Sequence, residues 1–345
     1  MNCHRQKPSP KLCFPVRMMP AIAALALGAC LWACTQADRK PAGATEKATM
    51  AYPSMLEATL VQVAQSQGYF RQEGLDVSAH VHPYGKLALK ELLEGKADFA
   101  TVAETPVMLA IMNSEDISVI ATISTSSIGH AILARKDKGI HTIVDLKGKK
   151  IATTLGTTAH FYQDMILAIN EISPKDVQTV NLDVEAIHDV LTQGDIAAVS
   201  TFNPHIVVTQ KKLGDRLITF QDKDVYTYTF NIVATREFTS KNPDKVRKLL
   251  HALLNSEKYV REHPLEAQKI MSAFSGVDSG LLSKIWDDYN FSVALDQQLI
   301  LLLEDESRWA INSGLTNERQ IPNYLNHIYF DGLRSVRPDA VRILR

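Results

Sequence analysis

Apolar and polar residues alternate along the chain in blocks whose period changes from that of a helix to that of a strand and back. Residues 55–66 repeat apolar side chains at helical spacing, and residues 74–81 alternate like a strand. Strands that alternate with helices of about 10–15 residues predict βαβ units and a mostly parallel sheet. Strands are predicted over residues 74–81, 97–103, 117–123, 150–155, 177–180, 196–201 and 230–235.

One order of elements occurs twice in this region. In residues 92–106 a helix ends at a glycine, a short apolar strand follows, and a polar residue with a proline opens the next helix. Residues 190–204 repeat that order, which predicts two similar α/β lobes, although unrelated α/β proteins also contain it. Beyond residue 235 the helical period dominates, and these helices have apolar faces that need a partner. They are predicted over residues 243–263, 265–274, 279–289 and 296–313.

The N-terminal segment has the pattern of an export signal. Residues 1–17 carry basic and no acidic side chains, and the apolar run 18–33 is shorter than the roughly 20 residues of a membrane span. We therefore expect a lipoprotein signal peptide over residues 1–33, with a spanning anchor as the alternative. Cys30 and Cys34 each end a run that looks like a bacterial lipobox, and either could be the acylated residue.

Cysteine usage agrees with an exported body on a lipid anchor. The four cysteines all lie within the first 34 residues, so the body has no disulfide, cysteine nucleophile or thiolate metal site. Residues 34–49 are small and polar, which predicts a flexible tether. The body is then expected in the periplasm or outside the cell.

Composition narrows the class of protein. A chain of 345 residues that is 46% apolar and 22% charged can build two domains with a sizeable core. Lys and Arg number 37 against 38 Asp and Glu, and the basic N-terminal segment leaves a net acidic body. This balance, without basic runs, argues against nucleic acid as a partner.

Motif searches point away from catalysis. The chain contains no G-x-S-x-G, H-E-x-x-H, Walker A or G-x-G-x-x-G motif, so we expect no enzyme activity and no cofactor. His80 and His82 would share one face of a strand. Two imidazoles alone do not make a metal site, and none is predicted.

Candidate ligand contacts lie where predicted strands end and helices begin. In parallel sheets ligands bind at the carboxyl ends of strands, and helix N-termini attract anions. Few Lys or Arg residues fall at these junctions, so backbone N–H groups and hydroxyls would hold an anionic ligand. The alternative is that these residues cap helices or pack in the core, and a histidine could bond within its own helix. The candidates are Tyr52, Ser54, Tyr84, Thr105, Thr125, Thr157, Thr158, His160, Phe202 and Asn203.

Three segments resemble signatures of a known family. Residues 68–77 read GYFRQEGLDV, residues 93–100 read LEGKADFA, and residues 139–152 read GIHTIVDLKGKKIA. In this order they resemble the solute-binding proteins of ABC transporters, in the nitrate, sulfonate, taurine and thiamine-precursor branch. Phe202-Asn203 departs from the branch, whose members commonly have Trp and an acidic residue there, which makes an aminosulfonate ligand less favoured.

The resemblance implies a type II periplasmic-binding fold, with two α/β lobes, a two-crossover hinge and a helical C-terminal segment. Lobe 1 would comprise residues 50–137 and 223–345, and lobe 2 residues 138–222. A small anionic or polar organic solute would be trapped between the lobes.

The same resemblance implies a monomeric, membrane-anchored receptor that delivers its solute to an ABC permease and its ATPase. Pyrimidine-forming enzymes of thiamine synthesis share the fold and are an alternative. They use a cysteine-rich motif in the cytoplasm, which this chain does not match. A ligand sensor without transport is a further alternative.

Overall fold

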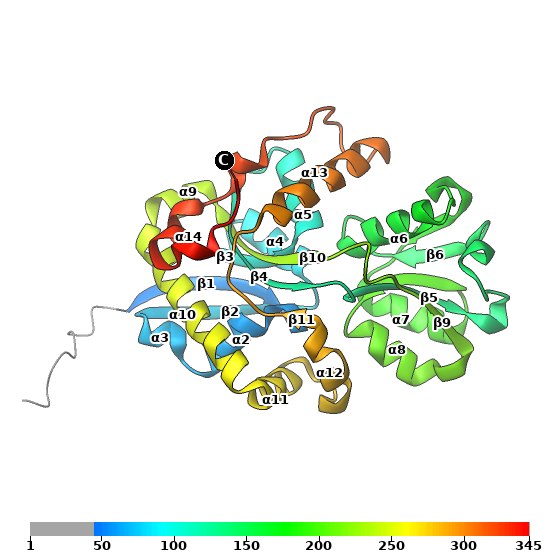
Figure 1. Cartoon of the computed structure of the whole chain (residues 1–345), viewed down its shortest axis with the longest axis horizontal. Helices are drawn as coiled ribbons and strands as arrows, with labels where there is room; N and C mark the ends of the chain where they lie inside the picture. Colours follow the sequence, from blue (N-terminus) through cyan, green and yellow to red (C-terminus); the bar gives the residue numbers. More distant parts are fainter. Residues whose placement is uncertain (1–44, 345) are drawn as a thin grey trace, which may run out of the picture. The chain divides into compact units, whose positions relative to one another are not determined.

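The computed structural model describes residues 45–344, and the chain there forms two β-sheets flanked by helices (Figure 1). The first sheet has the order β11-β4-β10-β3-β1-β2, and β10 runs antiparallel to both of its neighbours. Its strands are β1 (Glu46–Pro53), β2 (Leu75–His82), β3 (Phe99–Ala103), β4 (Ile117–Ser126), β10 (Tyr228–Thr235) and β11 (Tyr289–Asn290).

The second sheet repeats this arrangement with the order β7-β6-β8-β5-β9, in which β5 is antiparallel to both neighbours. The chain passes from one sheet to the other twice, through residues 127–129 and 221–227. These features are those of a type II periplasmic-binding fold with a two-crossover hinge, as predicted. The strands are β5 (His130–Arg135), β6 (Lys150–Thr153), β7 (Gln178–Asn181), β8 (Ala198–Phe202) and β9 (Leu217–Phe220).

Helices cover both faces of the first sheet. Figure 1 shows α4 and α5 on one face and α2, α3 and α10 on the other. Strands β4 and β10 are therefore buried along almost their whole length, and their polar residues bond to each other, as where the Thr122 hydroxyl donates to Asn231 Oδ1 over 2.7 Å. These helices are α2 (Thr59–Ser66), α3 (Tyr69–Gln72), α4 (Gly85–Leu93), α5 (Glu104–Met112) and α10 (Pro243–Glu262).

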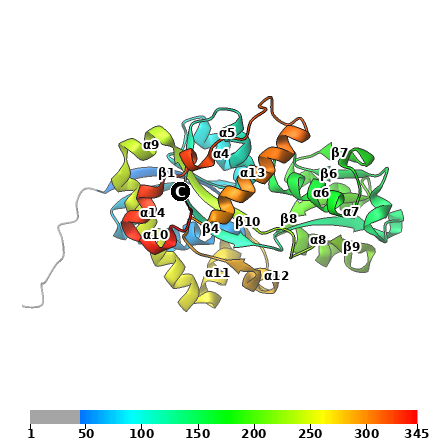
Figure 2. The ribbon, with the colours of Figure 1, turned by 45° about the horizontal axis from the view of Figure 1, so that its top comes forward.

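The second sheet carries α6 (Thr158–Ile169), α7 (Val184–Gln193) and α8 (His205–Leu213). The C-terminal helices pack on the first sheet's helices, α10 against α2 and α13 against α5 (Figure 2). The remaining helices are α9 (Arg236–Lys241), α11 (Pro264–Ser275), α12 (Ser279–Ile285), α13 (Gln297–Asn312) and α14 (Phe330–Val336).

Short 3-10 turns link several of these elements. They are η1 (Leu56–Ala58), η2 (Lys136–Lys138), η3 (Ile143–Leu146), η4 (Pro174–Asp176), η5 (Gly214–Arg216), η6 (Trp286–Asp288), η7 (Tyr324–His327) and η8 (Pro338–Ala340).

Strand pairing corrects two of the predicted boundaries. β5 pairs with β8 and β9, so His130–Arg135 belongs to the second sheet and not to the lobe predicted over residues 50–137. β1 starts at Glu46 because it pairs with Leu75 of β2, so the last residues of the predicted 34–49 tether are strand.

The structure also differs from the local predictions. Strands β1, β5, β9 and β11 were not among the predicted strands. The helix predicted over 279–289 ends at Ile285, and Tyr289 instead pairs with Ser126 at the edge of the first sheet. His80 and His82 do share a face of β2, where both rings bond to the Glu91 carboxylate.

The predictions for the N-terminus lie outside the described residues. These are the signal peptide over 1–33 and the lipidation sites Cys30 and Cys34. Within residues 45–344 no helix has the length and apolar character to cross a bilayer.

Candidate functional site

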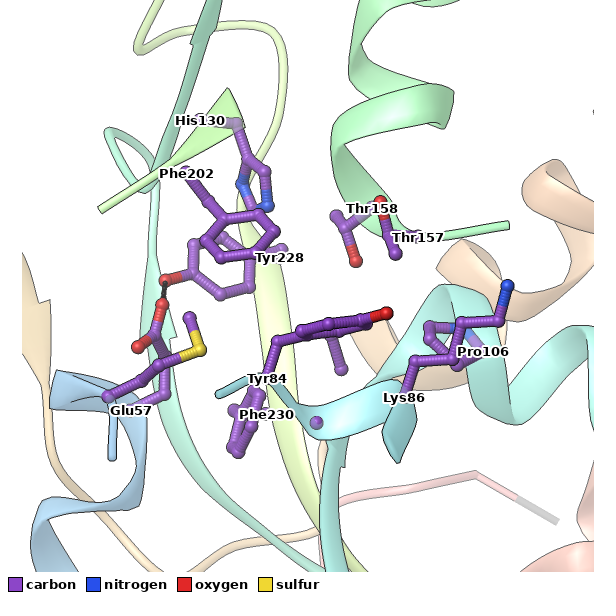
Figure 3. Close-up of a pocket in the computed structure, with 13 residues that line it drawn as sticks. Glu57, Tyr84, Lys86, Pro106, His130, Thr157, Thr158, Phe202, Tyr228 and Phe230 are labelled. Carbon is purple, nitrogen blue, oxygen red and sulfur yellow. Dashed lines mark hydrogen bonds between the residues drawn. The ribbon is translucent and has the colours of Figure 1, made fainter. Parts of the chain in front are cut away.

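A pocket lies where strands of both sheets end and helices α4 and α6 begin, and we name it the central pocket (Figure 3). The centre of a water-sized sphere can reach about 30 Å³ of it, and the space between the lining atoms, open solvent included, is about 370 Å³. Strands and helices of both sheets therefore contribute to one cavity. Its lining residues are Met55, Glu57, Tyr84, Gly85, Lys86, Ala103, Pro106, His130, Thr157, Thr158, Phe202, Tyr228 and Phe230.

The central pocket includes Tyr84, Thr157, Thr158 and Phe202 from the predicted ligand contacts. Thr157 is the N-cap residue of α6, and its hydroxyl donates to the Thr154 carbonyl over 2.7 Å. The buried Thr158 hydroxyl has no hydrogen-bond partner among residues 45–344. A solute in the pocket can therefore bond to the Thr158 hydroxyl without breaking an internal contact.

The start of α4 is fixed by a close backbone approach. Tyr84 is its N-cap residue, and a Cβ on Gly85 would lie 2.9 Å from the Cα of Val102 in β3. Glycine at this position lets the N-terminus of α4 press against the sheet beside the pocket.

The other predicted residues do not line the central pocket. The Tyr52 hydroxyl donates to Gln62 over 2.9 Å and its ring stacks on Phe274, so it is a core residue. Thr105 is buried and its hydroxyl donates to Glu306 over 3.0 Å. Ser54 and Thr125 also lie outside the lining.

His160 and Asn203 are neighbours of pocket residues in the sequence, but their side chains contact other parts of the protein. The His160 ring meets the Trp309 ring edge-on at 5.0 Å, and burial lowers its pKa. His160 lies instead in a separate groove between α6 and α13. Asn203 is buried, and its amide donates to the Ile128 carbonyl at the crossover over 3.4 Å.

Glu57 is the most informative residue that sequence reasoning missed. The Tyr228 hydroxyl donates to Glu57 Oε1 over 2.7 Å, whereas Oε2 has no hydrogen-bond partner in the part of the chain that the structure describes. Burial raises the pKa of Glu57 to about 7. In the sequence Glu57 is one acidic residue in a predicted helix, and nothing local distinguishes it from an exposed one.

His130 is the second missed residue. Burial lowers its pKa to about 3, so the imidazole is neutral at physiological pH. Its ring meets that of Tyr228 edge-on at 4.6 Å, and its Nδ1 has no partner. His130 begins β5, a strand that the sequence pattern did not reveal.

Gly129 explains how Tyr228 comes so close to the crossover. A Cβ on Gly129 would overlap the Tyr228 ring, so only glycine leaves space for it. The ring then reaches both His130 and the Glu57 carboxyl.

The two ends of the central pocket differ in charge. At one end are the N-termini of α4 and α6 with Lys86, whose ammonium donates to the Leu155 carbonyl over 2.7 Å. Burial lowers the Lys86 pKa. The carboxyl of Glu57 lies at the other end (Figure 3). A polar solute with different groups at its two ends would match this division.

A second group of buried acidic residues lies outside the pocket lining, and we name it the acidic cluster. It consists of Glu104 and Glu306 with their partners Tyr226, Thr229 and Thr105. Tyr226 donates to both carboxyls, and Glu104 also accepts from the Thr229 N–H over 2.9 Å. Burial raises the pKa of Glu104 to about 7, and burial with the charge of Glu104 raises that of Glu306 well above its usual range.

Comparison with known proteins identifies relatives of the chain. It is 25% identical over 228 residues to the "Putative aliphatic sulfonates-binding protein" of Bacillus subtilis, spanning 65% of this chain and 68% of that one. It is 24% identical to the taurine-binding periplasmic protein of Escherichia coli, spanning 61% and 65%.

A solved structure shows the same fold. The alkanesulfonate-binding protein of Xanthomonas axonopodis pv. citri, bound to MOPS, superposes with a TM-score of 0.73 at 16% identity. The superposition covers 83% of this chain and 99% of that one. A family model described as NMT1/THI5 like matches residues 56–267. Because that match covers more than half of the chain, the protein belongs to the NMT1/THI5-like family.

Proposed function

We propose that the chain is the solute receptor of an ABC importer, binding a sulfonate-, nitrate- or taurine-like solute in the central pocket. The observation that carries this proposal is the lining itself, which joins Glu57, Tyr84 and Tyr228 with Thr158 and Phe202 of the second sheet. A solute there touches residues of both sheets at once.

The two crossovers supply the motion that a receptor needs. We infer one lobe around each sheet, with residues 127–129 and 221–227 as the hinge. A solute that contacts both lobes only in the closed form shifts an existing open–closed equilibrium toward closure. The closed form would then be recognised by the permease and its ATPase.

We further propose that the receptor acts as a monomer, anchored by a lipid on Cys34 or Cys30 and facing the periplasm or the cell exterior. Substitution of the acylated cysteine by alanine should release the protein from the membrane fraction. The other single variant should stay membrane-bound, and both variants remaining there would reject lipid anchoring at these sites.

The receptor function is tested by thermal unfolding of the full-length chain with sulfonates, taurine, nitrate and related solutes. A solute at about 100 times its Kd should add about 2.7 kcal/mol of stability. The Thr157→Ala/Thr158→Ala double variant should lose most of this response but stay folded, with about 1 kcal/mol less stability without solute because the Thr157 bond to the Thr154 carbonyl is lost. If no solute stabilises the wild-type chain, or small-angle scattering shows no closure with one that does, the proposal is rejected.

A further inference from the structure

Glu57 holds an acceptor that the protein itself does not satisfy. The side chain is buried, and its Oε1 accepts from Tyr228, but its Oε2 faces no donor among the described residues. A buried acceptor without a partner is costly, so such atoms in native proteins usually meet water or a ligand. The free oxygen belongs to a residue that lines the central pocket.

The groups around Glu57 do not neutralise a negative charge on it. Tyr228 and Tyr289 are phenols whose pKa is raised well above its usual range by burial, and the buried His130 is neutral. Lys86 lines the pocket, but its ammonium bonds to the Leu155 carbonyl. Among the described residues Glu57 forms no ion pair, so a donor on the solute would be its natural partner.

The end of the central pocket opposite Glu57 favours hydrogen-bond acceptors on the solute rather than donors. The N-terminus of the twelve-residue helix α6 and the free Thr158 hydroxyl offer donors to an oxygen-rich group. A solute whose only polar group is an oxyanion can satisfy that end and leaves Glu57 Oε2 empty. A solute that also carries an N–H satisfies both ends.

We propose that Glu57 is the specificity-determining residue of the central pocket, selecting solutes that present an N–H donor to its free oxygen over solutes that present only anionic oxygens. This assignment rests on the proposed receptor function.

Two matched pairs of solutes isolate the effect of an N–H donor on affinity. Taurine differs from ethanesulfonate by one amine, and 4-aminobenzenesulfonate differs from benzenesulfonate in the same way. Calorimetric titration of the full-length chain at pH 8 should show each amine-bearing member binding about tenfold more tightly or better, as for a hydrogen bond to a charged group. Glu57→Gln should reduce that ratio to about threefold or less. The exposed Glu115→Gln is the matched control and should keep the wild-type ratio.

The wild-type chain gives a second measurement that does not depend on the variant folding. The ratio should fall between pH 8 and pH 5.5, because a protonated Glu57 attracts an amine less strongly. Equal affinities within both pairs, an unchanged ratio in Glu57→Gln, or no binding of either amine-bearing member would overturn the assignment. Binding of ethanesulfonate or nitrate with closure would still support the receptor function, so the two failures are distinguishable.

Discussion

Glu57 and Glu104 are both fully buried carboxyls whose pKa is raised to about 7, yet they sit in different surroundings. Glu104 accepts from Tyr226, from the Thr229 N–H and from the Thr229 hydroxyl. Glu57 accepts from the Tyr228 hydroxyl, and its Oε2, in a residue that lines the central pocket, has no hydrogen-bond partner among the described residues. Burial alone therefore does not mark a binding residue; an unsatisfied atom beside a cavity does.

The largest effect is expected from Glu104→Leu. The variant leaves the Thr229 N–H and hydroxyl buried without their acceptor, whereas Tyr226 keeps Glu306. This should lower the free energy of unfolding by about 2–5 kcal/mol. Urea unfolding measures this loss, with the exposed Glu115→Leu as control. A loss below about 1 kcal/mol would remove the distinction between the acidic cluster and the pocket.

The pH dependence of stability sharpens the comparison for Glu57. Its folded pKa of about 7 exceeds the ordinary 4.5, so the folded state binds more protons between these values. The free energy of unfolding should therefore fall as pH rises from about 4.5 to about 7, by on the order of 2 kcal/mol from this residue. Glu57→Gln should remove this part of the slope in urea unfolding at a series of pH values. Parallel curves for variant and wild type would show that Glu57 titrates normally.

His130, which has no counterpart in the acidic cluster, makes the free energy of unfolding depend on pH in the opposite direction to Glu57. Because its pKa is lowered to about 3, the unfolded state binds more protons between about 3 and 6.5. Its contribution to stability is therefore lost as pH falls through this window, by on the order of 1 kcal/mol or more. Nitrogen chemical shifts of the imidazole should show no titration between pH 5 and pH 8. A midpoint near 6.5 would mean that the ring is solvated.

The smallest effect is expected from Thr158→Val. The hydroxyl has no internal partner, so its loss should change the free energy of unfolding by less than about 0.5 kcal/mol. Affinity for a bound solute should weaken by about 0.5–1.5 kcal/mol, measured by calorimetry, whereas the exposed Thr45→Val should leave it unchanged. A stability loss without an affinity loss would place Thr158 with the structural residues of the acidic cluster.

The sequence pattern predicts most of the strands and four of the residues that line the central pocket. Period changes identify most helices and strands, and the junctions after predicted strands correctly point to Tyr84, Thr157, Thr158 and Phe202 as neighbours of one cavity. Thr105 occupies an equivalent junction but faces Glu306, because α13 covers it from a distant part of the chain. A junction rule cannot anticipate such coverage.

Glu57 and His130 escaped prediction because their character arises from distant contacts. Glu57 accepts from Tyr228, which is 171 positions away, and His130 begins a short strand that is defined by its pairing with β8 and β9. Charge and burial of this kind are properties of the folded state, and no local pattern encodes them.

Gly129 has a practical consequence for mutational scanning. Any side chain there collides with the Tyr228 ring and so disturbs the phenol that holds the Glu57 carboxyl in place. A library screened for solute uptake would therefore rank Gly129 beside true contact residues, although it has no atom beyond its backbone to offer a solute.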